Sequence, residues 1–337
     1  MHIDISSTEK DLRRIGDLAK KAEELGQDAV WCGEAGCDPF LQANEAIRST
    51  ERVSVGTGIA VALARTPMTV AYSAWSLADA SRGRFILGLG SQIKPHIERR
   101  YSMPWTHPVE QMREFVLATR TIFEAWRTEE RLSFQGKHYT HTLMSPFFAP
   151  TPHDYDIPIH LAAVGPRMFE MAGEVADGVL LHSFTNRAYL DTVSFPALDK
   201  GLAEASRTAQ PEVSLPMFMV MGDTDEELET QRQLTADQLS FYASTPAYQP
   251  VLEAIGFGDA QPELTVMSKR GEWKAMATLV SDELLDHFAI TGKPEDMPRL
   301  ARNHVGPRVN RVTSYFGWPD LEPGRLEAIF ADFNAGE

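Results

Sequence analysis

The chain has 337 residues, with 32 Lys and Arg against 47 Asp and Glu, which gives a formal net charge of −15 at pH 7. Nucleic acids and anionic membranes bind to basic faces, so this charge argues against both as main partners, although one small phosphorylated ligand could still bind in a local pocket. Hydrophobic residues make up 43% of the chain, enough for a large core. The length fits either two domains or one large α/β barrel.

The two cysteines, Cys32 and Cys37, exclude a disulfide scaffold and favour a reducing compartment. Four residues separate them and no further ligands lie nearby, so we expect free thiols and no metal site. No apolar run reaches the roughly 18–20 residues that span a bilayer, and residues 1–21 lack the apolar core of a signal peptide. We therefore expect a cytoplasmic protein.

Short apolar runs alternate with amphipathic segments along the chain. Many of the runs are continuously apolar, as in parallel strands that are buried on both faces. We expect eight strands: His2–Ile5, Asp28–Trp31, Val53–Ala62, Phe85–Leu89, Ile157–Ala163, Gly178–Leu181, Leu215–Met221 and Val309–Phe316.

Helical segments lie between most of these strands. Leu12, Ile15, Ala19 and Ala22 recur at helical spacing, and Gly26 ends the helix well. This helix is expected at Asp11–Leu25, and the others at Thr69–Ala80, Val109–Arg127, Pro166–Ala176, Asp225–Ser244 and Leu321–Phe333. Eight strand–helix units predict a (β/α)8 TIM barrel. The alternative, a doubly wound sheet, usually has a glycine-rich turn after its first strand, and Ser6–Glu9 contains no glycine.

Two connections are longer than a plain barrel needs. Residues 92–155, after strand four, hold one predicted helix and a hairpin around Gln135–Gly136, and residues 223–307, after strand seven, hold two or three helices. Long loops of this kind usually carry binding function. We expect one domain over residues 1–337 with these two insertions.

The segment Val164-Gly165-Pro166-Arg167 follows strand five, at the barrel face where active sites lie. Glycine lets backbone approach a ligand closely, and proline suits the first position of a helix. The amides that follow, the helix dipole and the Arg167 charge together favour an anion such as phosphate. The other interpretation is that Gly-Pro merely turns the chain into a helix.

Strand four runs into Gly88-Leu89-Gly90-Ser91-Gln92. A lone G-x-G is weak evidence for dinucleotide binding, so it indicates either tight packing or close approach of a flat ring to Gly90 and Ser91. The basic residues that follow form either a solvated helix face or a positive rim that attracts an anion: Lys94, His96, Arg99 and Arg100.

Glu34 and Asp38 follow strand two and form either a working carboxylate pair or two solvated loop acids. Histidine titrates near neutral pH, so His141 and His182 are further candidates for proton transfer. No H-E-x-x-H or G-x-S-x-G pattern indicates a metalloprotease or a serine hydrolase.

Several stretches resemble the bacterial luciferase-like superfamily of flavin- or deazaflavin-dependent oxidoreductases. Their order and spacing carry the resemblance over nearly the whole chain: 22–31 with Glu34, Gly56–Ile59, Ala78–Gly90, Pro158–Arg167 and Ala172–Val179. The resemblance is nearest to the branch that uses coenzyme F420, although FMN-dependent members share the pattern. It implies a TIM barrel with insertions, in agreement with the strand count.

The resemblance also implies a cofactor site. A bulge with a non-prolyl cis peptide, here Gly58–Ile59, would back the flavin ring. Gly90, Ser91 and Gln92 would line that ring, and Val164, Gly165, Pro166 and Arg167 would hold the cofactor phosphate. Some deazaflavin sugar-phosphate dehydrogenases have Asp-His after strand two, whereas this chain has Glu34-Ala35, so the resemblance does not extend to that substrate.

We therefore expect an oxidoreductase that uses coenzyme F420 for hydride transfer to or from a small organic substrate, with Glu34 as the leading candidate for proton transfer. The alternatives are an FMN-dependent monooxygenase and a barrel that binds a ligand without turnover. We expect a homodimer.

Overall fold

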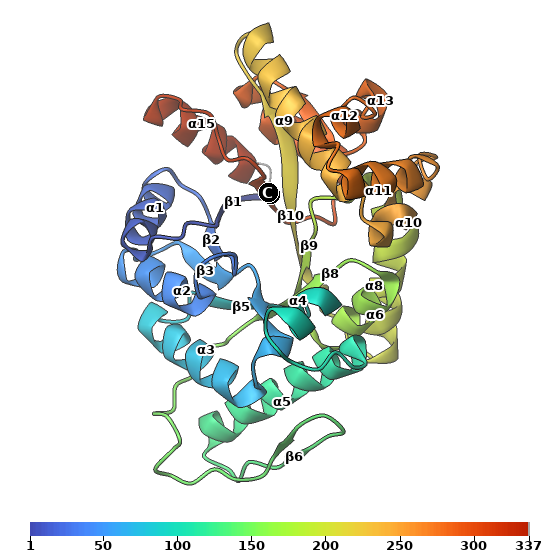
Figure 1. Ribbon diagram of the computed structural model, residues 1–337. Coiled ribbons are helices and arrows are strands. Elements are labelled where there is room, and N and C mark those ends of the chain that lie inside the picture. The colour runs from blue at the N-terminus through green and yellow to red at the C-terminus, as the bar shows by residue number, and fades with distance from the viewer. Residues whose placement is uncertain (336–337) are drawn as a thin grey trace. The chain divides into compact units, whose positions relative to one another are not determined.

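The computed structural model describes residues 1–335 (Figure 1). The chain divides into two compact units. The larger unit comprises Ile5–Leu180 and Ala197–Glu212, and the smaller one comprises Met1–Asp4, Leu181–Pro196 and the described part of Val213–Glu337. Within the described residues, no helix has the length and apolar character needed to cross a bilayer.

All eight predicted strands are present. Their hydrogen-bonded order runs β10, β12, β1, β2, β3, β5, β8, β9, and β9 pairs in turn with β10, so the sheet closes as the predicted (β/α)8 barrel requires. At this closure the Glu212 N–H donates to the Asp177 carbonyl oxygen at 3.0 Å. The bounds are β1 His2–Ser7, β2 Ala29–Cys32, β3 Ser54–Thr57, β5 Phe85–Gly90, β8 Ile159–Ala163, β9 Gly178–Leu181, β10 Glu212–Met221 and β12 Arg311–Ser314.

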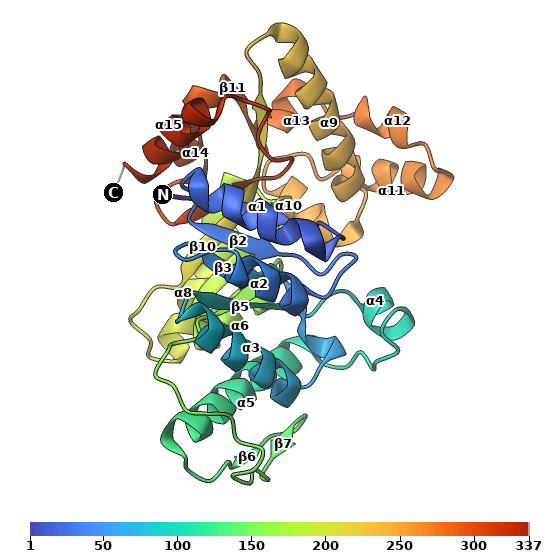
Figure 2. The same ribbon diagram turned by 90° about the vertical axis from the view of Figure 1, so that its left-hand side faces the viewer.

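The helices of the larger unit cover its strands, and α1, α2, α3 and α5 follow one another side by side in chain order (Figure 2). Buried residues at helical spacing, Ile15, Ala19 and Ala22, explain why α1 forms. The sequence interpretation did not include α2, which begins at Pro39 behind the capping residue Asp38. The bounds are α1 Leu12–Glu24, α2 Pro39–Arg48, α3 Pro67–Ser81, α5 Pro108–Thr128, α6 Pro166–Val175 and α8 Phe195–Glu204.

The connection after β5 contains the predicted hairpin, β6 (Phe134–Gln135) paired antiparallel with β7 (Thr140–His141). It also contains a short helix that the sequence interpretation did not include, α4 (Lys94–Arg99). The Glu114 carboxylate of α5 accepts from the backbone N–H groups of residues 137, 138 and 139, which holds the hairpin against that helix.

The smaller unit contains more structure than the predicted helices of residues 223–307. A short strand, β11 (Ala289–Gly292), pairs parallel with Phe218–Met221 of β10. Helix α9 starts at a capping box formed by Thr224 and Glu227. The remaining bounds are α7 Arg187–Tyr189, the π-helical segment η2 Leu190–Ser194, α9 Asp225–Ala243, α10 Gln249–Glu253, α11 Ala260–Arg270, α12 Trp273–Ala277, α13 Asp282–Asp286, α14 Met297–Val305 and α15 Pro323–Asn334.

A buried ion pair joins β1 to β12. The Arg311 Nε and Nη2 atoms both donate to the Asp4 carboxylate at 2.8 Å, and the two side chains are 8% and 0% exposed. We predict that Arg311→Met lowers the free energy of unfolding by about 3–5 kcal/mol, because it leaves a buried carboxylate uncompensated. Urea denaturation measures this value. Arg13→Met, which removes the 89% exposed partner of Asp11, is the control and should change stability by less than about 1 kcal/mol. Equal losses in the two variants would contradict the prediction.

Candidate active site

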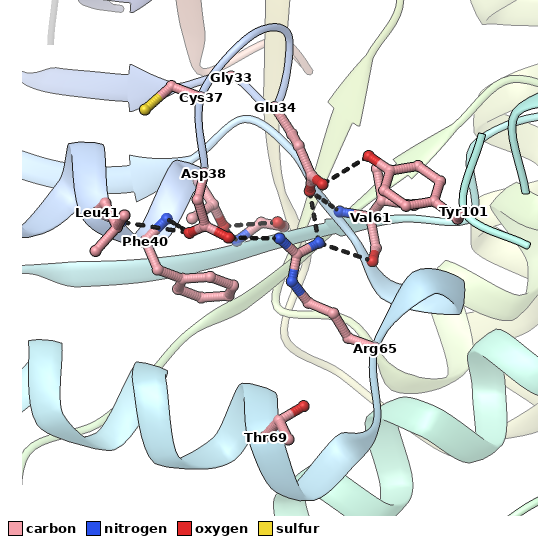
Figure 3. Close-up of polar contacts among 12 residues, drawn as sticks. Gly33, Glu34, Cys37, Asp38, Phe40, Leu41, Val61, Arg65, Thr69 and Tyr101 are labelled. Atoms are coloured by element: carbon pink, nitrogen blue, oxygen red, sulfur yellow. Dashed lines mark hydrogen bonds and ion pairs between the residues drawn. The ribbon is translucent and has the colours of Figure 1, made fainter. Parts of the chain in front are cut away.

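The Glu34 carboxylate stands just after the carboxyl end of β2 and is almost completely buried, with 8% of its side chain exposed. Its Oε2 atom accepts from the Val61 N–H at 2.7 Å and from Arg65 Nη1 at 2.6 Å, and its Oε1 atom accepts from the Tyr101 hydroxyl at 2.7 Å (Figure 3). All three donors belong to the protein. The geometry thus joins segments that are far apart in the sequence at one buried charge.

Arg65 links this carboxylate to Asp38. Its Nη2 atom donates to Asp38 Oδ2 at 2.8 Å, while Asp38 Oδ1 accepts from the Phe40 N–H and caps α2 (Figure 3). Burial alone would lower the pKa of Arg65, but the hydrogen bonds to Glu34 and Asp38 outweigh it and raise that pKa. Burial and the bond to Glu34 raise the pKa of Tyr101 to about 12, so its hydroxyl stays a donor at neutral pH.

The predicted strand 53–62 is split into β3 and β4 (Ala60–Val61), and the Gly58–Ile59 peptide between them is cis, as the resemblance implied. The Gly58 N–H donates to the Cys32 carbonyl oxygen at 2.8 Å, and β4 pairs with the end of β5. A Cβ atom added at Gly90 would lie 3.0 Å from Ile59 Cδ1 and 3.3 Å from Ala162 Cβ. The bulge, the end of β5 and β8 therefore meet around Gly90.

The two glycines of the G-x-G sequence have different surroundings. A Cβ atom at Gly88 would lie 1.8 Å from the Thr57 carbonyl oxygen, and the Thr57 hydroxyl also accepts from the Gly88 N–H at 2.9 Å. Gly88 is thus required by packing, which is one of the two interpretations of the motif. Gly90 stands at the carboxyl end of its strand, beside the bulge.

Ser91 and Gln92 follow Gly90 and turn the chain toward α4. Gln92 has a positive φ of 61°, and its side-chain oxygen accepts from the Ile93 N–H at 3.0 Å. The basic residues beyond it are exposed, although Lys94 pairs with Glu98 at 3.7 Å and Arg100 lies over the Tyr101 ring. Tyr101, through Glu34, is the side chain that ties this segment to the end of β2.

The segment after β8 has the features of an anion site. Gly165 is the N-cap of α6 and has no side chain to cap the helix, and a Cβ atom added there would meet nothing within 4 Å. Pro166 is the first helical residue, and Val164 precedes the cap. Arg167 is exposed and makes no ion pair with any described residue. The unpaired cation and the helix N-terminus thus both face open space.

The two candidate histidines belong to other elements. His141 belongs to β7 in the hairpin beside α5, burial lowers its pKa, and its Nε2 atom has no hydrogen-bond partner within the described residues. His182 directly follows β9 and belongs to the smaller unit. Burial lowers the pKa of His182 to about 4, and its Nδ1 atom accepts from the Phe184 N–H at 3.0 Å.

The sequence interpretation missed Arg65 and Tyr101. Arg65 immediately precedes the Thr66-Pro67 start of α3, which is a detectable helix signal but says nothing about a partner 31 residues earlier. No local pattern distinguishes Tyr101.

Both cysteines are free, and burial raises the pKa of Cys32 to about 12. The part of the chain that the structure describes has no cluster of His, Cys, Asp and Glu suited to a metal ion.

The chain is similar to proteins of one known family. The family model described as luciferase-like monooxygenase matches residues 2–301. The chain belongs to the luciferase-like monooxygenase family. An uncharacterized protein of Mycobacterium tuberculosis is 47% identical over 312 residues, which is 92% of each chain. The 5,10-methylenetetrahydromethanopterin reductase of Archaeoglobus fulgidus is 27% identical over 282 residues, which is 82% of each chain.

Solved structures confirm the barrel fold. The coenzyme F420 dependent tetrahydromethanopterin reductase of Methanopyrus kandleri superposes with a TM-score of 0.78 at 20% identity, covering 99% of this chain and 98% of that one. The oxygenating constituent of 3,6-diketocamphane monooxygenase from Pseudomonas putida, solved in complex with FMN, gives a TM-score of 0.67 at 15% identity, covering 99% and 97%.

The Glu34 group allows a stability prediction. We expect Glu34→Gln to lower the free energy of unfolding by about 1.5–3 kcal/mol, because hydrogen bonds to a charged group are lost or weakened in a buried place. Urea denaturation measures the change. Glu98→Gln removes an exposed carboxylate that pairs with Lys94 and should change stability by less than about 1 kcal/mol. If the two variants behaved alike, the Glu34 carboxylate would not hold the surrounding segments together.

His182 allows a pH prediction. Burial lowers its pKa from the ordinary 6.5 to about 4 in the folded chain, so the unfolded chain binds more protons between these pH values. Stability therefore falls as pH drops from about 6.5 to 4, by at most about 3 kcal/mol from this residue. We predict that His182→Phe flattens this part of the stability–pH curve relative to the wild type in urea denaturation at several pH values. An unchanged curve would show that His182 does not contribute to acid sensitivity.

Proposed function

We propose that the protein is an oxidoreductase that binds coenzyme F420 and transfers hydride to or from a small organic substrate. The observation that carries the proposal is the open helix N-terminus at Gly165 with the unpaired Arg167. It follows β8, which pairs with β5, and the end of β5 at Gly90 pairs in turn with β4, directly after the cis Gly58–Ile59 peptide. F420 is favoured over FMN by the name of the M. kandleri reductase.

The residues present fit a phosphate-bearing cofactor with a flat ring. Gly165 leaves open space where a phosphate would lie, and the exposed Arg167 side chain can pair with it. Gly90 is buried at the end of β5, where Ile59 and Ala162 leave no room for a side chain, and it would line the ring together with Gly58, Ser91 and Gln92. A bound deazaflavin would supply the hydride chemistry at this place.

The chain's own residues would supply position and charge. The Glu34 carboxylate holds the Val61 N–H of β4, and with it the segment that follows the bulge. Since both oxygens of this buried carboxylate already accept from Val61, Arg65 and Tyr101, we assign Glu34 to holding this segment in place rather than to proton transfer. His182 is assigned no proton-transfer step, because its Nδ1 atom already accepts from the Phe184 N–H. His141 is assigned none because it lies in the β6–β7 hairpin.

An FMN-dependent monooxygenase is the second candidate. The family takes its name from monooxygenases, and the P. putida structure contains FMN. The same anion site and ring wall would suit FMN, which also carries a phosphate. A homodimer and a cytoplasmic location, inferred from the sequence, are part of the proposal.

Calorimetric titration of the purified chain with coenzyme F420 and with FMN tests the proposal. We expect F420 to bind more tightly, and Arg167→Glu to weaken that binding about tenfold to a hundredfold, since a charge-assisted hydrogen bond to phosphate contributes about 1.5–3 kcal/mol. Arg131→Glu, which makes the same charge change at an exposed loop residue, is the control and should leave the affinity within about twofold. Binding of FMN without binding of F420 would favour the monooxygenase.

A further inference from the structure

The smaller unit contains a group of aromatic side chains around His182. The His182 ring is stacked on Tyr248 at 5.0 Å and meets Tyr242 edge-on at 4.7 Å, measured between ring centroids. The Tyr242 and Tyr315 hydroxyls share a hydrogen bond of 2.6 Å. We call these four residues, His182, Tyr242, Tyr248 and Tyr315, the tyrosine–histidine cluster. They come from the end of β9, from α9, from the turn Pro246–Tyr248 and from the end of β12.

The backbone fixes which nitrogen of His182 carries the proton. Nδ1 accepts a hydrogen bond from the Phe184 N–H, so it cannot itself be protonated in that arrangement. In a neutral imidazole the proton is then on Nε2. The imidazole is neutral at working pH because burial lowers its pKa. His182 therefore presents a neutral N–H donor, and not a base.

The cluster keeps polar groups that the protein does not use. His182 Nε2 and the Tyr248 hydroxyl make no hydrogen bond within the described residues, and both side chains are partly exposed. In the Tyr242–Tyr315 pair one hydroxyl donates to the other, so one O–H group is left over. Burial raises the pKa of both Tyr248 and Tyr315, so these hydroxyls also stay protonated. The cluster thus combines aromatic surface with neutral hydrogen-bond donors.

We propose that the tyrosine–histidine cluster is a binding site for a neutral, planar organic molecule that carries an acceptor oxygen, such as an aromatic ketone or aldehyde. Aromatic rings would contact the ligand ring, and the His182 Nε2–H would donate to its oxygen. Tyrosines can also surround a cation, but a cation offers no acceptor to these donors. The inference does not depend on the proposed cofactor, because it rests on the contacts among these four residues and Phe184.

The test measures ligand binding to the full chain by calorimetry without added cofactor. Acetophenone is the probe, and ethylbenzene, which has the same ring without the oxygen, is its matched control. We expect acetophenone to bind more tightly than ethylbenzene. His182→Phe keeps an aromatic ring and removes the donor, so it should weaken acetophenone binding about threefold to tenfold and leave ethylbenzene unchanged.

Three further variants make the result specific. His182→Gln places a side-chain amide donor in the region of Nε2 and should restore part of the affinity. His287→Phe makes the same exchange outside the cluster and should have no effect. Tyr248→Phe removes one hydroxyl with little change in shape, and it serves as the test if circular dichroism shows that His182→Phe does not fold.

Three results would overturn the proposal. These are equal affinities for acetophenone and ethylbenzene, an acetophenone affinity that is unchanged in both His182→Phe and Tyr248→Phe, and a preference for phenyltrimethylammonium over acetophenone. Failure of F420 or FMN to bind would count against the proposed function but would leave this result standing, because no cofactor is present in the experiment.

Discussion

The buried carboxylate of Glu34 is the constraint on which the candidate site depends. Its side chain is only 8% exposed, and a carboxylate so deeply buried is stable only if hydrogen-bond donors surround it. Here the donors come from Val61, Arg65 and Tyr101. Each donor belongs to a different part of the larger unit, so satisfying one charge places β4, the start of α3 and the end of α4 together. Arg65 extends this order to Asp38 and hence to the start of α2.

Apolar runs predicted the eight barrel strands because burial on both faces leaves a strong local signal in the sequence. Two of the missed elements, β11 and α4, lack that signal. Only Ala289 and Ile290 are buried in β11, and only Ile97 is buried in α4, so neither shows an apolar run. The break between β3 and β4 falls within an apolar run, 53–62, that reads as one strand. Only the resemblance to a known family indicated an interruption at Gly58–Ile59.

The candidate site left a signal in the sequence only where its residues are consecutive. The segment Val164–Arg167 indicates an anion-binding helix start by itself, because a glycine, a proline at the first helical position and an arginine are adjacent. Arg65 and Tyr101 were not predictable, since their roles arise from contacts with Glu34 over 31 and 67 residues of sequence. The G-x-G motif is visible in the sequence, but the different surroundings of its two glycines are not. Only three-dimensional packing shows that Gly88 lies against the Thr57 carbonyl and Gly90 beside the bulge.

Glu34 and His182 show two ways of placing an ionisable group away from water. Glu34 lies among an arginine, a backbone amide and a tyrosine hydroxyl that together compensate a charge. His182 lies against the Tyr242 and Tyr248 rings and accepts one backbone N–H, and burial lowers its pKa so that the ring is neutral. The oxygens of Glu34 already accept hydrogen bonds from the protein, which suits a residue that holds segments in place. A neutral ring with one nitrogen left unbonded keeps a donor for a ligand, and on this difference we propose a positioning role for Glu34 and a binding role for His182.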